Sequence, residues 1–176
     1  MKLVLLTVRY KTSFLQALDE YLKEDSRPST QDLFLLDKKE LEKDFSTYVS
    51  RLIDESHGKN LPEGYISHTD YWFIDGNEFI GRVDIRHSLN ENLLRIGGHI
   101  GYDIRPSKRN QGYGKELLKL ALPKAKALGL TKVLVTCDES NIASKKIIEV
   151  NGGVLENSIE QHGGLPKKLR YWITLS

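Results

Sequence analysis

The stretch that most constrains the fold is residues 104–114, Ile-Arg-Pro-Ser-Lys-Arg-Asn-Gln-Gly-Tyr-Gly, which a helix-forming run follows at once. A strand-like segment ends at Ile104, and a helix begins around two glycines, Gly112 and Gly114. The first N–H groups of a helix lack intrahelical partners and carry the positive end of its dipole, so such a terminus favours anions, above all phosphate. The glycines let a ligand approach the backbone closely, and Lys108 and Arg109 add positive charge. The loop therefore predicts a site for a phosphate-bearing cofactor.

Two known phosphate loops do not match this stretch. A P-loop requires Gly-x-x-x-x-Gly-Lys-Ser/Thr, which is absent from the sequence, and the dinucleotide fingerprint requires a third glycine and an early βαβ unit. What remains is Arg-x-x-Gly-x-Gly between a strand and a helix. The alternative interpretation is an ordinary helix start with two incidental glycines.

Length and composition indicate one ordinary globular domain, residues 1–176, with 39% apolar and 28% charged residues. The net charge of +2 gives no reason to expect a nucleic-acid or membrane partner, and no run approaches the roughly 18 apolar residues of a membrane span. The single cysteine, Cys137, excludes an internal disulfide. The N-terminal apolar run is interrupted by Arg9 and reads as a strand, so we expect a cytoplasmic protein. No metal site is expected.

The hydrophobic periodicity predicts seven strands and four helices. Asp75-Gly76-Asn77 is a hairpin signal between two of the strands, and the paired glycines 97 and 98 indicate a bulge or a close backbone approach. Alternation sends Tyr71 and Phe73 to one face of the sheet and Trp72 to the other. In order we expect a strand over 2–8, helices over 12–23 and 39–55, strands over 70–74, 78–87 and 93–104, a helix from the loop to 128, a strand over 132–137, a helix ending near 151–153, and strands over 154–159 and 168–175.

This order, together with Arg109-Asn110-Gln111-Gly112-Tyr113-Gly114, resembles the GNAT superfamily of acetyl-CoA-dependent N-acetyltransferases. Two later stretches are similar as well, Asn-Ile-Ala-Ser at 141–144 and Glu-Val-Asn-Gly at 149–152. His-Ile-Gly-Tyr at 99–102 resembles the branch that includes ribosomal-protein N-terminal acetyltransferases. The resemblance implies an α/β (α+β) fold with a mixed, mainly antiparallel central sheet of about seven strands, flanked by about four helices.

The resemblance also implies how acetyl-CoA, the cosubstrate, would sit. The amides around 111–115 would take the pyrophosphate, and the backbone of 102–104 would pair with the pantetheine arm like an extra strand, which requires a splayed sheet edge there. Asn141 would reach the pantetheine or a bound water, although it reads equally well as a helix N-cap. The expected cofactor-binding residues are Tyr102, Asp103, Ile104, Arg109, Asn110, Gln111, Gly112, Tyr113, Gly114, Lys115, Asn141 and Ser144.

Transfer to an amine requires a general base, because only the neutral amine attacks the thioester. His99, on the strand before the loop, is the first candidate, since an imidazole with a pKa of about 6.5 suits that role. The alternative is a structural histidine bonded inside the sheet. Glu139 is a second candidate, unless it is only a solvated loop acid, and Asp84 and His87 are weaker ones.

The departing thiolate raises a second question. Many GNAT members carry a tyrosine on the last helix that protonates it, but Ile148 stands at the matching position here. Tyr113, Cys137 or water would then serve, or the thiolate would leave unassisted. Cys137 as an acyl-enzyme nucleophile is the less favoured alternative to a small buried hydrophobe.

We therefore expect an acetyltransferase that moves an acetyl group to a primary amine of a small molecule or peptide, by direct attack in a ternary complex. Homodimers are common in the family that the chain resembles, while the sequence leaves the oligomeric state open. The alternatives are an acyl-CoA sensor without catalysis and a nucleotide-binding protein that uses the same loop.

Overall fold

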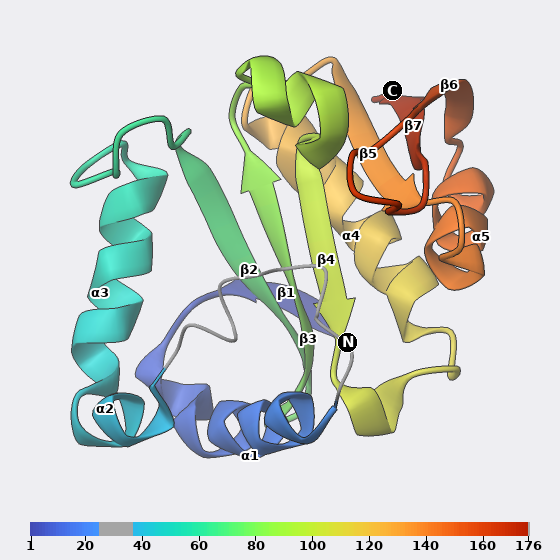
Figure 1. Ribbon diagram of the computed structural model, residues 1–176. Coiled ribbons are helices and arrows are strands. Elements are labelled where there is room, and N and C mark those ends of the chain that lie inside the picture. Colours follow the sequence, from blue (N-terminus) through green and yellow to red (C-terminus); the bar gives the residue numbers. More distant parts are fainter. Residues whose placement is uncertain (25–36, 176) are drawn as a thin grey trace.

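The computed structural model describes residues 1–24 and 37–175 (Figure 1). All seven predicted strands are present. The helix predicted over 12–23 and the helix predicted from the loop to 128 are present as well. In chain order the elements are β1 (Lys2–Leu5), η1 (Val8–Tyr10), α1 (Lys11–Lys23), α2 (Lys38–Lys43), α3 (Phe45–Ser56), β2 (His68–Asp75), β3 (Glu78–Arg86), η3 (Leu93–Gly97), β4 (Ile100–Ile104), η4 (Pro106–Lys108), α4 (Tyr113–Ala127), β5 (Lys132–Asp138), α5 (Ile142–Val150), β6 (Val154–Ile159) and β7 (Lys168–Thr174).

The strands form two sheets, a four-stranded one in the order β1-β2-β3-β4 and a three-stranded one in the order β5-β7-β6. Every ladder within them is antiparallel. The predicted turn closes the β2–β3 hairpin, where Asp75 pairs with Glu78. The expected mainly antiparallel α/β class is therefore confirmed, with the strands divided between two sheets.

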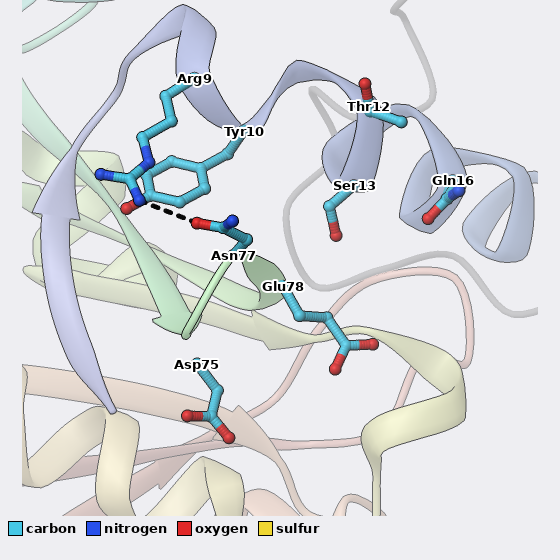
Figure 2. A pocket seen from close by; sticks show the side chains of 8 residues that line it. All are labelled: Arg9, Tyr10, Thr12, Ser13, Gln16, Asp75, Asn77 and Glu78. Atoms are coloured by element: carbon cyan, nitrogen blue, oxygen red, sulfur yellow. Dashed lines mark hydrogen bonds between the residues drawn. The ribbon is translucent and has the colours of Figure 1, made fainter.

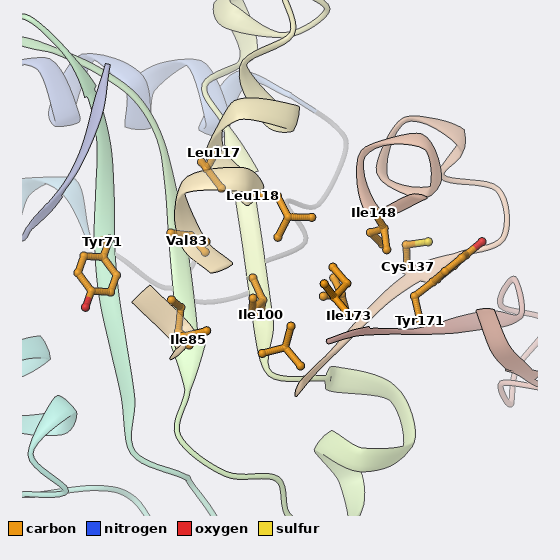
Figure 3. Close-up of a cluster of buried hydrophobic side chains, with 14 of the residues drawn as sticks. Tyr71, Val83, Ile85, Ile100, Leu117, Leu118, Cys137, Ile148, Tyr171 and Ile173 are labelled. Atoms are coloured by element: carbon orange, nitrogen blue, oxygen red, sulfur yellow. The ribbon is translucent and has the colours of Figure 1, made fainter. Parts of the chain in front are cut away.

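Two hydrophobic cores lie on opposite faces of the first sheet, as the alternation along β2 predicts. Tyr71 and Phe73 belong to the core under α4, which continues to Cys137 and Ile148 (Figure 3). Trp72 belongs to the core under α1 and α3, where Phe14 stacks on it with ring centroids 4.9 Å apart. Each fully buried large side chain contributes about 1.5–3 kcal/mol of hydrophobic stabilisation, so these cores hold the helices on the sheet.

The helix predicted over 39–55 is two helices, because Asp44 interrupts it. The Asp44 carboxylate accepts a hydrogen bond from the Thr47 backbone N–H at 3.1 Å and caps α3. Further hydrogen bonds from the hydroxyls of Thr47 and Ser46 lower the pKa of Asp44 to about 2. A capping aspartate has non-helical backbone angles, so the first helix ends where the second begins.

The strand predicted over 93–104 is also shorter than expected. Leu93–Gly97 forms a π-helical turn, η3, whose first N–H donates to the Asn90 side chain at 2.9 Å. Gly98 then has φ +72°, and a Cβ there would lie 2.6 Å from the Leu134 carbonyl oxygen on β5. The close approach indicated by the paired glycines is thus found at Gly98.

The two sheets meet at one end of β4 and β5 and then diverge. The His99 N–H donates to the Leu134 C=O at 2.7 Å, and the Leu134 N–H donates to the His99 ring at 2.9 Å. Beyond this point β4 pairs with β3, and β5 pairs with β7. We call the region between β4 residues 100–104 and β5 residues 135–138 the splay. It is the splayed edge that the resemblance implied.

Candidate active site

Helix α4 begins at the foot of the splay, directly after Gly112. This N-cap residue has φ +84°, and a Cβ there would meet no atom of the described residues within 4 Å. Glycine is therefore required by the left-handed backbone conformation, and the space in front of it is open. The first bond into the helix runs from the Glu116 N–H to the Gly112 C=O at 3.3 Å, so the N–H groups of 113–115 precede the intrahelical ladder. This terminus suits an anion, as the sequence predicts.

Gly114 is a glycine for a different reason. A Cβ there would lie 2.6 Å from the Ile147 Cδ1 atom on α5. Gly114 is buried and lets α4 and α5 pack closely. Its missing side chain thus serves helix packing, although the sequence suggested ligand approach.

Arg109 is partly exposed, and its guanidinium is held by several hydrogen bonds. Its Nε donates to the Ile104 C=O at 2.9 Å, and one terminal nitrogen donates to both Glu24 oxygens at 2.8 and 2.9 Å. The other lies 3.3 Å from Asp103 Oδ1. Burial raises the pKa of Asp103, and the positive charge of Arg109 opposes that rise. The guanidinium joins the loop to α1 and β4, which corrects the expectation that its charge is available to a phosphate.

The remaining loop residues lie around the α4 terminus. Lys108 forms an ion pair with Glu78 at 2.8 Å, and the Gln111 amide donates to the Ser107 C=O at 3.1 Å, which holds that side chain against its own loop. Asn110, with φ +61°, and Lys115 are exposed. These side chains lie around the turn that precedes α4, and the amides of 111–115 stay the predicted anion site.

The backbone of β4 alternates between its two edges. The Arg86 N–H donates to the His99 C=O at 2.8 Å, and the Arg105 N–H donates to the Ile80 C=O at 2.9 Å. These bonds direct the odd-numbered residues of β4 toward β3. By the alternation of a strand, the backbone groups of the even-numbered residues face the splay.

This alternation separates the three β4 residues predicted to pair with a ligand. The Ile104 C=O faces the splay but accepts the Arg109 bond. Asp103 faces β3, so its backbone is not placed for pairing, which corrects that expectation. The N–H and C=O of Tyr102 face the splay and suit strand-like pairing with an amide-bearing ligand.

His99 is bonded inside the sheet. Because its Nδ1 accepts the Leu134 N–H, the neutral ring carries its proton on Nε2 and has no lone pair left for a base. Burial and the nearby charge of Arg86 lower the pKa of His99 to about 4. This geometry does not suit a general base, and the alternative interpretation, a structural histidine, describes it.

The other two predicted catalytic residues, Glu139 and Tyr113, are not placed to act on a substrate in the splay. Glu139 is an exposed turn residue after β5. This position agrees with the alternative interpretation of Glu139 as a solvated loop acid. The Tyr113 ring packs edge-on against Phe73 of β2, with centroids 6.2 Å apart. Since β2 is two strands away from β4, this ring is not placed to reach a leaving group in the splay.

Asp84, a weaker candidate from the sequence, has the most suitable surroundings. It lies opposite Gly101 in the β3–β4 register, and a Cβ on Gly101 would be 2.5 Å from Asp84 Oδ1. Its other oxygen is 3.0 Å from Arg86. Burial raises the pKa of Asp84, the charge of Arg86 opposes this, and Asp70, opposite it on β2, adds to the rise. A largely buried carboxylate with a raised pKa that lies against Gly101 of β4 can accept a proton there.

A row of charged side chains on β2 and α3 lies next to Asp84. His68 Nε2 lies 3.2 Å from Asp70 Oδ2 and 3.6 Å from Glu55 Oε2 on α3. The hydrogen bond to Asp70 raises the pKa of His68 to about 9, so the ring is charged at neutral pH and compensates the acids. His87 is separate, because its Nε2 bonds the Thr69 hydroxyl at 2.8 Å and burial lowers its pKa.

On the other side of the splay, Asn141 caps α5. Its side-chain oxygen accepts the Ser144 N–H at 3.0 Å, which confirms the N-cap interpretation. The Ser144 hydroxyl in turn lies 2.8 Å from the Tyr102 hydroxyl on β4. Cys137 is buried nearby, and burial raises its pKa to about 11, which disfavours a nucleophilic role. Ile148 is fully buried in the core.

A surface hollow of about 510 Å³ lies elsewhere, between the start of α1 and the β2–β3 turn (Figure 2). Arg9 reaches across it and donates to Asn77 at 2.9 Å. Its walls come from η1, α1 and the hairpin, so it is separate from the splay. In the described residues no helix is long and apolar enough to cross a membrane.

Comparisons with known proteins agree with this architecture. A search of curated proteins found no match. Among solved structures, the ribosomal L7/L12 protein α-N-acetyltransferase RimL in complex with coenzyme A is 17% identical, with a TM-score of 0.71 over 98% of this chain and 93% of that one. A point mutant of the spermidine N-acetyltransferase SpeG of Vibrio cholerae is 17% identical, with a TM-score of 0.62 over 100% of this chain and 96% of that one.

The microcin C7 self-immunity acetyltransferase MccE, in complex with acetyl-CoA and AMP, is 13% identical, with a TM-score of 0.68 over 98% of this chain and 91% of that one. At these identities the likeness concerns the fold. The family model of the acetyltransferase (GNAT) domain matches residues 27–154, which span the first sheet from β2 onward, the loop, α4, β5 and α5. The chain therefore belongs to the GNAT acetyltransferase domain family.

Proposed function

We propose that the protein transfers an acetyl group from acetyl-CoA to a primary amine by direct attack. The observation that carries this proposal is the largely buried Asp84 carboxylate of β3, which lies against Gly101 of β4. Family membership supports the reaction class. The structural neighbours that act on ribosomal protein and on spermidine support an amine acceptor, either peptide or small molecule.

The residues at the foot of the splay fit acetyl-CoA. The open space before Gly112 and the N–H groups of 113–115 would receive its diphosphate. The splay-facing N–H and C=O of Tyr102 would pair with the amides of its pantetheine arm. Acetyl-CoA supplies the acetyl group as an activated thioester.

Asp84 would act as the general base in place of His99. It takes the proton that the amine loses as the new C–N bond forms, and the raised pKa makes it a stronger base than a solvated aspartate. Splay-facing N–H groups of β4 would donate to the carbonyl oxygen as negative charge develops there. Attack and proton removal then occur from the Gly101 side of β4.

The test is a coenzyme A release assay with a panel of amines that includes peptide N-termini, spermidine and free amino acids. Asp84→Asn should lower kcat about 100-fold or more, while calorimetry shows unchanged acetyl-CoA affinity. Asp75→Asn, in the exposed hairpin turn, is the matched control and should behave as wild type.

Three outcomes contradict the proposal. Equal rates in the Asp84→Asn and Asp75→Asn proteins would remove Asp84 from the mechanism. Binding of acetyl-CoA without release for any amine would favour a sensor. Preferential binding of ATP or NAD would favour a nucleotide-binding protein.

A further inference from the structure

Two carboxylates lie opposite each other on neighbouring strands of the first sheet. Asp70 of β2 is the register partner of Asp84 of β3, and side chains directly opposite on antiparallel strands have Cβ atoms about 4.5–5.5 Å apart. Only 7% of the Asp70 side chain and 13% of the Asp84 side chain are exposed. A like charge this close disfavours the ionised form of its neighbour, so Asp70 makes Asp84 hold a proton more strongly.

His68 is positively charged where it meets Asp70. Its Nδ1 lies 3.2 Å from the Ile66 C=O, and its Nε2 lies 3.2 Å from Asp70 Oδ2 and 3.6 Å from Glu55 Oε2. Both ring nitrogens therefore face groups that only accept hydrogen bonds, and only the imidazolium can donate from both. This agrees with the pKa of about 9 that the hydrogen bond to Asp70 gives the ring. His68 thus holds the Asp70 carboxylate and compensates its charge.

The Asp70 carboxylate has apolar neighbours on the side of β1 and α3, the helix that lies beside β2 (Figure 1). Asp70 lines a void of about 10 Å³ together with Leu6 and Leu52. On its β4 side, Asp84 meets the backbone of Gly101. Charges interact more strongly in such surroundings than in water, so the effect of Asp70 on Asp84 is weakly screened.

Charged groups surround Asp84 on several elements. They are Arg82 and Arg86 on β3, His68 and Asp70 on β2, Asp103 on β4, and the Arg51–Glu55 pair on α3. Arg86 lies 3.0 Å from Asp84 Oδ2, and the other oxygen, Oδ1, lies nearest to Gly101. The acid that the register sets opposite Asp84 is Asp70. Arg86 thus orients the carboxylate, while Asp70 opposes its negative charge.

We propose, resting on the proposed function above, that Asp70 is a positioning residue whose negative charge strengthens Asp84 as the general base, with the His68 imidazolium holding Asp70 in place. Asp70 acts through Asp84. The proton that the amine loses goes to Asp84, and the charges of Asp70 and His68 stay as they are during the reaction.

The first test is the pH profile of kcat/KM with an amine that the panel identifies, because its acidic limb reports the pKa of the base in the free enzyme. Asp70→Asn removes the neighbouring charge and keeps the shape, so the limb should move to lower pH by about half a unit or more. His68→Gln removes the opposite charge and should move the limb to higher pH. A purely structural role would lower the stability of both variants without moving the limb in opposite directions.

Asp75→Asn is the matched control, because it removes a carboxylate from the exposed end of the same strand. Its limb should coincide with that of wild type. In Asp70→Asn the rate above the limb should fall far less than the about 100-fold loss expected for Asp84→Asn, since the base itself is retained.

The second test needs no turnover. Nuclear magnetic resonance titration of the isotope-labelled Asp84 carboxyl, assigned by the loss of its signal in Asp84→Asn, measures the pKa of Asp84 directly. We expect a lower pKa in Asp70→Asn than in wild type, and the same direction in Asp70→Ser, which removes the charge with a smaller side chain. A pKa of Asp84 that is unchanged in these variants would overturn the proposal. A pKa that moves while the kinetic limb stays in place would instead remove Asp84 as the base, so the two tests separate failure of this inference from failure of the proposed function.

Discussion

Gly112 allows a direct test of the proposed diphosphate site. Its φ of +84° costs about 1–2 kcal/mol for any residue with a Cβ, while open space around the Cβ position adds no steric cost. Ala, Gln and Glu at this position therefore share the same backbone strain. They differ in what they place before the α4 terminus: a methyl group, a neutral amide or a carboxylate.

The charge effect can be estimated from distance. A carboxylate about 6 Å from a diphosphate with about two charges is repelled by about 1.4 kcal/mol in bulk water and about 5.5 kcal/mol at an effective dielectric constant of about 20. Because Gly112 is exposed, we expect a value toward the lower limit. Gly112→Glu should then bind acetyl-CoA about 10- to 100-fold more weakly than Gly112→Gln.

Isothermal titration calorimetry of the three variants with acetyl-CoA measures this difference, and thermal denaturation verifies that their stabilities agree. The Gln–Glu difference should shrink as salt is added, since the charges are screened. Equal dissociation constants for Gly112→Gln and Gly112→Glu at low salt would refute the placement of the diphosphate at this turn.

Two further predictions concern the buried charges. Arg109→Ala removes the ion-pair partner of the buried Asp103 carboxylate and leaves the charge of Arg82 to compensate it. Unfolding should therefore become about 1–3 kcal/mol easier, and the melting temperature should fall by about 2–12 °C. An unchanged melting temperature would show that the Arg109 contacts do not stabilise the fold. His99 has a folded-state pKa of about 4 against about 6.5 when unfolded, so the unfolded state binds more protons between these values. The contribution of His99 to the free energy of unfolding is therefore complete above about pH 6.5. It is lost, by at most about 3 kcal/mol, as the pH falls to about 4. In His99→Gln the side-chain oxygen can still accept the Leu134 N–H, but it does not titrate. Urea denaturation should therefore show a smaller loss of unfolding free energy from pH 7 to pH 5 in this variant than in wild type. Equal losses in the two proteins would show that His99 is not the origin of the effect.

Local patterns along the chain predicted most of the elements. The alternation at Tyr71, Trp72 and Phe73 placed these side chains in the two cores where they are found. The glycines of the loop predicted the start of α4 after Gly112. Such features depend on neighbours within a few residues, so they are readable from one sequence.

Where the local prediction failed, a short polar interaction was responsible. Asp44 caps α3 within a pattern that looks like one continuous helix. Asn90 starts the turn of η3 inside an apolar run that reads as a strand. Periodicity follows apolar side chains, and one capping side chain can end an element without changing that pattern.

The sequence by itself determined the family, the order of elements and the position of the anion-binding helix terminus, because these follow from a contiguous motif and from local spacing. Only the tertiary structure decided which side chains carry the chemistry. His99 lost the role of base because Leu134, 35 residues away, occupies its ring nitrogen. Asp84 gained that role because strand register sets it against Gly101, and Arg109 became a clamp because folding brings Glu24 to it from 85 residues away. Each of these outcomes depends on which distant residue arrives at an atom, and spacing along the chain does not encode that.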